Sequence, residues 1–206
     1  FENKEKIEFD DVVRACIRTI YNAPETIKNG TCEDNEQTAY HEAGHALIAE
    51  ILEPESVTMI SIGGHEGSSI GGFTAYYRDE SYWQSVKSMK NRVLCLLGGK
   101  CATEIKYGTL DAGCSSDIER AVDVVKRIII EYVGIGFDKC SSYFSFEVSE
   151  LQKFFQNKSI NDELEKSYTK ARQILIENRD LLDRLASELN KKKLLISEDI
   201  KKIIKN

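Results

Sequence analysis

Apolar residues recur at helical spacing along most of the chain. Within residues 1–27 they gather on one face of a short helical pattern, which stops ahead of Pro24 because the residue before a proline disfavours the helical conformation. The polar stretch 28–35 predicts a linker. The next helix is predicted over about 36–52 and ends before Pro54.

The spacing changes to two between residues 57 and 62, where branched side chains alternate as they do in a β-strand. A glycine-rich turn leads from there to a second candidate strand over 72–77. Beyond residue 81 the pattern is helical again and predicts helices near 82–98, 100–107, 116–133, 160–190 and 197–204. The predicted fold class is therefore mainly α (α+β), with a small β-sheet beside the helix at 36–52.

A long apolar seam marks the predicted helix at 160–190. Its positions are alternately four and three residues apart, the heptad pattern of a helix packed along a partner: Leu164, Tyr168, Ala171, Leu175, Asn178, Leu182, Leu185 and Leu189. Because the seam is shorter than four heptads, an intramolecular hairpin partner is favoured over a dimeric coiled coil.

Composition narrows the possible functions. The chain has 206 residues, of which 41% are hydrophobic, enough for one sizeable core. Its formal net charge of -6 argues against a nucleic-acid partner, because neutralising phosphates requires clustered Lys and Arg. The one basic run, 191–193, is better explained as the end of a helix or a solvated turn.

The cysteines and the chain start bear on the cellular setting. The 6 cysteines form no CxxC pair and no framework spacing, which favours a reducing compartment. No apolar stretch reaches the length of a membrane span, and no signal peptide is recognisable. A start at Phe1 instead of Met leads us to expect a piece of a longer protein, whose upstream part could hold an anchor.

The segment His41-Glu42-Ala43-Gly44-His45 carries the strongest chemical signal in the chain. Residues four apart lie one turn above each other on a helix, so His41 and His45 can present two imidazole nitrogens to one metal ion. Glu42 lies about 100° round the helix from His41, where it can take a proton from a metal-bound water. Such a motif also occurs by chance, but the surrounding residues are small or apolar, and buried imidazoles need partners.

A catalytic zinc usually takes a third protein ligand and leaves one position open. The metzincin pattern would need a histidine at position 51, where this chain has Ile51, so that class is excluded. His65, in the glycine-rich turn, is better explained as an exposed turn residue. Glu104 and Asp117 are stronger candidates. Spacing alone slightly favours another role for Asp117, in the first turn of a helix with a capping box formed by the Ser and Glu at 116 and 119.

Three segments together resemble the peptidase domain of the FtsH family, the ATP-dependent zinc proteases of membranes (peptidase family M41). They are the HEAGH segment, residues 97–104 (LGGKCATE) and residues 112–121 (AGCSSDIERA). The stretch 168–183 is similar to the closing helices of the family, and residues 1–27 resemble the last helix of an AAA+ lid. The resemblance thus implies two parts, an AAA+ lid tail plus linker at 1–35 and an M41-like zinc peptidase domain at 36–206.

The resemblance assigns roles to single positions. It implies that His41, His45 and Asp117 bind one Zn²⁺, that Glu42 is the general base, and that Glu104 orients a ligating histidine from behind. It also implies a substrate-binding edge strand, on which an extended peptide adds as a further strand: Gly72, Phe73, Thr74, Ala75 and Tyr76.

The resemblance also implies partners and a reaction. Zinc-dependent hydrolysis of unfolded or flexible polypeptides, a homo-hexameric ring and a place on the cytoplasmic side of a membrane are expected from it. The chain departs from the family in having Thr103 before Glu104 where two acidic residues are usual, and in lacking a GxxxxGK[ST] phosphate loop. An ATPase must then lie upstream or in another subunit, or be absent. The rival hypothesis is a catalytically silent assembly module of the same fold.

Overall fold

The computed structural model describes most of the chain from residue 32 onward. The described residues are 6–7, 11, 15, 19, 27–28, 32–62, 64–65, 71–77, 85–109, 112–132 and 149–205. The helix predicted within residues 1–27 therefore lies outside the described residues except for isolated positions. The same holds for most of the glycine-rich turn that follows residue 62.

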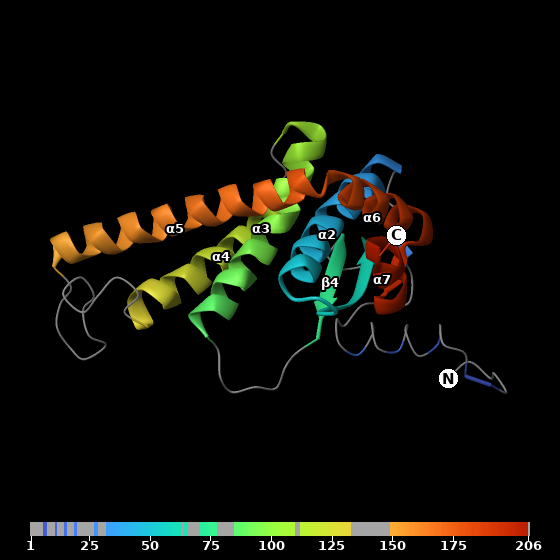
Figure 1. Cartoon of the computed structure of the whole chain (residues 1–206), viewed down its shortest axis with the longest axis horizontal. Coiled ribbons are helices and arrows are strands. Elements are labelled where there is room, and N and C mark those ends of the chain that lie inside the picture. Colours follow the sequence, from blue (N-terminus) through green and yellow to red (C-terminus); the bar gives the residue numbers. More distant parts are fainter. Residues whose placement is uncertain are drawn as a thin grey trace.

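The described part is mainly helical with a small antiparallel sheet, which confirms the predicted fold class (Figure 1). The elements, in chain order, are β1 (Ile27–Lys28), α2 (Cys32–Leu52), β2 (Val57–Ile62), β3 (Gly64–His65), β4 (Gly72–Tyr76), α3 (Val86–Tyr107), a 3-10 turn (Ala112–Cys114), α4 (Ser115–Lys126), a π-helical turn (Arg127–Glu131), α5 (Glu150–Glu177), α6 (Arg179–Lys192), β5 (Leu194–Ile196) and α7 (Ser197–Lys205).

Helix α2 lies at the centre of the fold. It contacts α3, α6, β2 and β4, and its residues from Ala39 to Ala49 are almost all buried. A helix that is apolar all round its axis is stable only when other elements cover it. Figure 1 shows α2 between α3 and α6, with β4 beside it. The helix begins at Cys32, so it includes half of the stretch that was predicted as a linker.

Two glycines allow the backbones of α2 and α3 to come into direct contact where the helices cross. A Cβ atom at Gly44 would lie 2.4 Å from the carbonyl oxygen of Gly98, and one at Gly98 would lie 2.7 Å from the carbonyl oxygen of Gly44. The prediction of two helices at 82–98 and 100–107 is wrong, because α3 runs unbroken through this point. The glycines serve the crossing of two helices, which a local pattern does not reveal.

The sheet has the order β4-β2-β5 and is antiparallel throughout. Strand β2 is central, with Ile60 paired to Thr74 of β4 on one side and to Leu195 of β5 on the other. Both strands predicted at 57–62 and 72–77 are confirmed within one residue. Within the described part of the sheet, β4 has β2 as its one neighbour, so it is an edge strand of that sheet.

The seam predicted at 160–190 is buried within the chain, but two helices carry it. Helix α5 begins at residue 150, where the side chain of Ser149 caps it in a capping box with Gln152. The chain bends at Asn178, whose side-chain amide donates a hydrogen bond to the carbonyl of Ile174. Helix α5 then contacts α3 and α6 contacts α2. The intramolecular partner is confirmed, although it is not the other arm of a hairpin.

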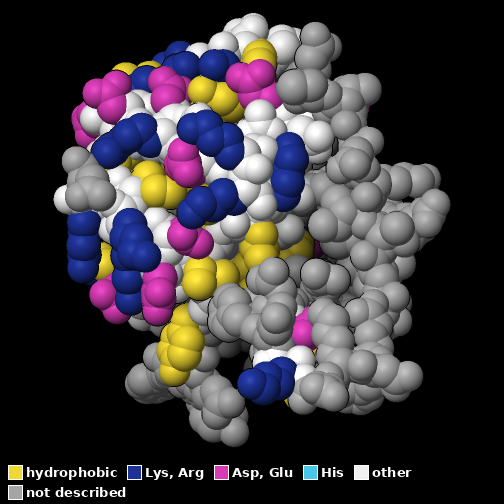
Figure 2. Space-filling view, turned by 90° about the vertical axis from the view of Figure 1, so that its right-hand side faces the viewer, with side chains coloured by type: hydrophobic (Ala, Val, Ile, Leu, Met, Phe, Trp, Pro, Cys, Tyr) yellow, Lys and Arg dark blue, Asp and Glu magenta, His cyan; other side chains and the backbone are white. Residues whose placement is uncertain are grey.

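The face around α6 and α7 mixes charges of both signs (Figure 2). Ion pairs join Lys191 to Glu188, Lys192 to Asp199 and Lys201 to Glu55 there. The run of basic residues ends α6, as the sequence suggested, with Lys193 in the left-handed C-cap conformation. No helix in the described part of the chain is long and apolar enough to cross a membrane.

Candidate metal centre

Helices α2 and α4 bring three of the predicted site residues together. The Nε2 atoms of His41 and His45 lie 3.0 Å apart, and each is 3.2 Å from Oδ2 of Asp117. Among the described residues, these three form the one group of His, Cys, Asp or Glu whose potential ligand atoms all lie within 4.8 Å of one another. The three atoms form a nearly equilateral triangle.

The protonation of His45 follows from its other ring nitrogen. Nδ1 lies 2.6 Å from the carbonyl oxygen of Cys95 on α3. A carbonyl can only accept, so Nδ1 must carry the proton, and Nε2 of the neutral ring presents a lone pair toward Asp117. A lone pair that faces a carboxylate oxygen requires a proton or a metal ion between them. The backbone contact to Cys95 therefore leaves Nε2 of His45 as the ring nitrogen that could bind a metal ion.

Gly99 on α3 leaves the space in which the two imidazoles lie. A Cβ atom at this position would be 2.5 Å from Cε1 of His41 and 2.6 Å from Nε2 of His45. No larger residue fits there without moving the histidines. Nδ1 of His41 lies beside Gly99, is buried and has no hydrogen-bond partner among the described residues.

The electrostatics of the three residues also suit a cation. Burial alone would raise the pKa of Asp117, but the hydrogen bonds to His41 and His45 outweigh it and hold that pKa well below its ordinary value. Burial alone would lower the pKa of His45, but the hydrogen bond that the protonated ring can donate to Asp117 and the nearby Glu42 carboxylate raise it. The carboxylate is thus ionised, and in acid a proton competes with a metal for His45.

Glu42 lies on the same helix but faces β4. Its side chain is buried, with 5% exposure, and its Oε2 accepts a 2.7 Å hydrogen bond from the hydroxyl of Thr74. Burial raises the pKa of Glu42 above its ordinary value, although the nearby histidines partly offset this. A carboxyl group whose pKa moves toward neutrality is better matched to accept and release a proton near pH 7.

The expectation for Glu104 does not fit this geometry. Its carboxylate is paired with Lys100 and accepts a 2.5 Å hydrogen bond from the hydroxyl of Tyr168 on α5. It is not the partner of the second ring nitrogen of either histidine, since Nδ1 of His45 contacts the Cys95 carbonyl and Nδ1 of His41 has no hydrogen-bond partner among the described residues. Glu104 instead links α3 to α5, because the packing of the two helices places the Tyr168 hydroxyl beside its carboxylate.

The structure also bears on two other predictions from the sequence, the capping box at 116–119 and the turn at His65. The capping box at residues 116–119 does not form, because α4 begins at Ser115 and its cap is Cys114, without a side-chain cap hydrogen bond. Asp117 is therefore in the first turn but is turned toward α2. The backbone of His65 lies in β3 and pairs with β1, so the prediction of a turn at this residue is wrong.

The donor set fits a zinc ion. Zinc bonds to nitrogen and oxygen are about 2.0–2.2 Å long, so two ligand atoms on a tetrahedral ion lie roughly 3.3–3.5 Å apart. The separations of 3.0 and 3.2 Å between His41, His45 and Asp117 are only slightly shorter. Two imidazoles and one carboxylate are also the ligand types that occur in catalytic zinc sites with one open position.

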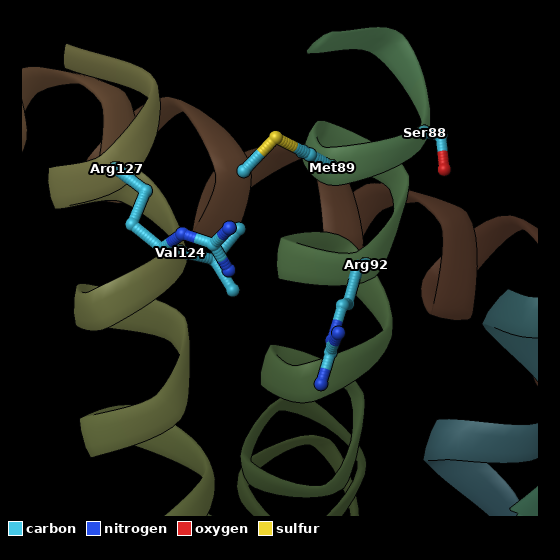
Figure 3. Close-up of a pocket in the computed structure, with 5 residues that line it drawn as sticks. All are labelled: Ser88, Met89, Arg92, Val124 and Arg127. Carbon is cyan, nitrogen blue, oxygen red and sulfur yellow. The ribbon is translucent and has the colours of Figure 1, made fainter. Parts of the chain in front are cut away.

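A separate small cavity lies between α3 and α4 (Figure 3). It has a volume of about 30 Å³, which holds only a water molecule or two, and none of the metal-centre side chains lines it. Its lining consists of Ser88, Met89, Arg92, Val124 and Arg127. It has no room for a peptide.

The fold and the three-donor centre define a class of protein, the metallopeptidases with an HExxH helix and a distant third ligand. The model of peptidase family M41 matches residues 29–203. The chain belongs to this family. The resemblance inferred from the sequence, and with it the zinc metallopeptidase class, is confirmed.

Relatives cover nearly the whole chain. It is 27% identical to the ATP-dependent zinc metalloprotease FtsH of Bacillus subtilis, over 98% of this chain and 34% of that protein. It is 29% identical to the protein of the same name from Rhodothermus marinus, over 98% of this chain and 31% of that protein. With FtsH 4 of Sorangium cellulosum the identity is 29%, over 84% of this chain and 29% of that protein. The chain thus spans about a third of these relatives.

Proposed function

We propose that this chain is a zinc-dependent endopeptidase domain that hydrolyses peptide bonds in unfolded or flexible polypeptides. The observation that carries the proposal is the triangle of donor atoms from His41, His45 and Asp117, with the buried Glu42 beside it on the same helix. The family membership and the names of the relatives support zinc as the metal.

Each residue has a distinct role in this proposal. His41, His45 and Asp117 would hold the ion, which when bound supplies a Lewis acid for the scissile carbonyl and lowers the pKa of a coordinated water. Glu42 accepts a proton at its carboxylate and passes it to the leaving amine. A site that was purely structural would need no such base, so the buried Glu42 favours catalysis over a silent assembly module.

The outer side of the edge strand β4 is the proposed substrate site. An extended peptide that pairs with residues 72–76 would run beside α2 and pass the metal centre, because β4 contacts α2. Strand pairing binds a peptide through its main chain and depends little on its side chains, which suits a peptidase of broad specificity. Phe73, Ala75 and Tyr76 remain at least partly accessible on this strand.

The partners follow by analogy with the relatives. Their printed names include "ATP-dependent", and about two thirds of their length lies outside the match. We propose that residues 36–206 work as the peptidase domain beside an ATPase that feeds unfolded substrate to it, in a homo-hexameric assembly on the cytoplasmic face of a membrane. Residues 1–35 would then connect the two parts.

The decisive test replaces Glu42 with Gln. The Glu42→Gln variant should keep its zinc, measured by mass spectrometry of the metal, and its fold, measured by circular dichroism. Cleavage of an unfolded substrate such as casein should fall by at least about 100-fold, the usual contribution of a general base. Glu36→Gln, on the same helix but partly exposed, is the matched control and should cleave like the unmodified chain. Zinc-loaded wild type that cleaves no substrate would overturn the proposal.

A further inference from the structure

The carboxylate of Glu42 is held by a side chain from the sheet. Thr74 of β4 donates its hydroxyl proton to Oε2 of Glu42 over 2.7 Å. The Thr74 oxygen also lies 3.3 Å from the main-chain carbonyl of Glu42, but the single hydroxyl proton favours the shorter, charge-assisted contact. In the proposed reaction the orientation of this carboxylate decides where a proton is accepted.

The strand is built to make this contact at a fixed place. The antiparallel pairing of Thr74 with Ile60 holds its backbone against the central strand β2. Threonine is branched at Cβ, so few side-chain rotamers are open to it. Gly72, two residues earlier and therefore on the same face, allows the close approach, because a Cβ there would lie 2.9 Å from Cγ of Glu42.

We propose that Thr74 is a positioning residue, which orients the Glu42 carboxylate from the edge strand of the sheet. The edge strand proposed to bind the substrate is then also the strand that orients the general base. A peptide that pairs with β4 would steady Thr74, and through it Glu42, in the bound state. This inference rests on the proposed function, because it assigns Thr74 a role in that reaction.

The activity test uses the zinc-loaded full chain and an unstructured fluorogenic peptide. Thr74→Val removes the hydroxyl while keeping the branched shape, and it should lower kcat about tenfold with little change in KM, because the carboxylate remains but is no longer aligned. Thr74→Ser should restore most of the rate. Thr58→Val is the matched control, since Thr58 donates to the Ala75 carbonyl on the same sheet and has no contact with Glu42.

A second readout is independent of catalysis. The urea midpoints of the metal-free wild type, Thr74→Val, Glu42→Ala and the double variant form a thermodynamic cycle. The Thr74→Val substitution should lower the midpoint when Glu42 is present and leave it nearly unchanged in the Glu42→Ala background. Zinc content should stay equal in all single variants at position 74, which separates positioning from a loss of the metal.

The outcomes are distinct. Loss of kcat in Thr74→Val, rescue by serine, an unaffected Thr58→Val and a coupled cycle support the inference. It is overturned if Thr74→Val cleaves like Thr58→Val, if its rate falls only in proportion to its zinc content, or if the midpoint shifts are additive. Wild type without zinc-dependent cleavage would instead refute the proposed function, and the assignment of Thr74 with it.

Discussion

The carboxylate of Asp117 reaches the site from α4, 72 residues beyond His45 along the chain. It supplies the one negative charge among the three potential ligand groups. Without it, only the two imidazole nitrogens would face the position of the ion. Arg120, one turn along α4, is 3.8 Å from its other oxygen and stays largely exposed. The charge on Asp117 is therefore directed mainly toward the centre.

Asp117→Ala should lower zinc affinity by more than about 100-fold. Losing a residue that only hydrogen-bonds to a metal ligand already lowers metal affinity by about 10- to 100-fold. The fold should persist, because the Asp117 side chain does not belong to the apolar core. Competition with a chelator, followed by metal analysis, measures the change. Asp123→Ala, at an exposed position on the same helix, is the control. Equal zinc affinity in the two variants would contradict the assignment.

Single residues differ in how far the sequence predicts them. His41, Glu42 and His45 are predictable because helical geometry alone places them on adjoining faces of one turn. Asp117 was a candidate from the sequence, but its assignment as the third ligand depended on a family resemblance, since spacing slightly favoured a helix cap. Thr74 was expected only as part of a substrate-binding strand. Neither its hydrogen bond to Glu42 nor the space at Gly99 has a local signal, because both arise where distant elements meet.

The crossing of α2 and α3 is the contact between elements on which the site most depends. Gly44 lies between the two histidines, and Gly98 lies next to Gly99, so this crossing sets the distance from both imidazoles to α3. The carbonyl of Cys95 that holds His45 belongs to the same stretch of α3. Any shift between these helices would change the metal centre as well as the core.

Gly44→Ala should therefore destabilise the fold by about 3 kcal/mol, because the new Cβ would meet backbone atoms that cannot move aside. Zinc affinity should fall as well, since α3 is pushed away from His45. Urea unfolding followed by circular dichroism measures the first effect, and chelator competition measures the second. Gly71→Ala should be nearly neutral in both, because the nearest atom there is Thr38 Oγ1 at 3.5 Å. A variant at Gly44 as stable as one at Gly71 would refute the close crossing.

Elements whose pattern is purely local were predicted well, and their interruptions were not. The two main strands follow from alternation of branched residues, and α2 follows from its apolar run. The break at Asn178 was missed because the heptad pattern continues across it, while the chain changes its packing partner from α3 to α2. The π-helical turn over 127–131 at the end of α4 was likewise not predicted from the apolar spacing.

The molecule as a whole is organised round α2, and this arrangement was only partly foreseeable. A buried helix with a sheet beside it follows from composition and pattern, as the fold class shows. Which helices cover it depends on contacts between residues far apart, such as the hydrogen bond from Tyr40 on α2 to Asp183 on α6. Burial of the whole core also withdraws ionisable thiols from water, and this links the stability of the fold to pH.

Burial raises the pKa of the Cys101 thiol from 9.0 to about 12, with a further contribution from the nearby Glu104 carboxylate. Cys101 is fully buried on α3. In the unfolded chain the thiol loses its proton near pH 9, whereas the folded chain keeps it, so the unfolded state binds fewer protons above that pH. The contribution of the protonated Cys101 thiol to the stability of the fold is therefore complete below pH 9 and is lost as the pH rises toward 12.

The free energy of unfolding of the metal-free chain should therefore be steady from pH 7 to 9 and then fall, with Cys101 contributing up to about 1.4 kcal/mol per pH unit. Urea titrations at half-unit intervals up to pH 11 measure the slope. Cys101→Ala should reduce the slope of the free energy of unfolding against pH, because it removes the titrating thiol. A change in stability at pH 7 shifts the whole curve and leaves this comparison intact. An unchanged slope would mean that the thiol meets water in the native state, and α3 could not then lie as close to α5 as the Cys101 contact to the Tyr168 carbonyl requires.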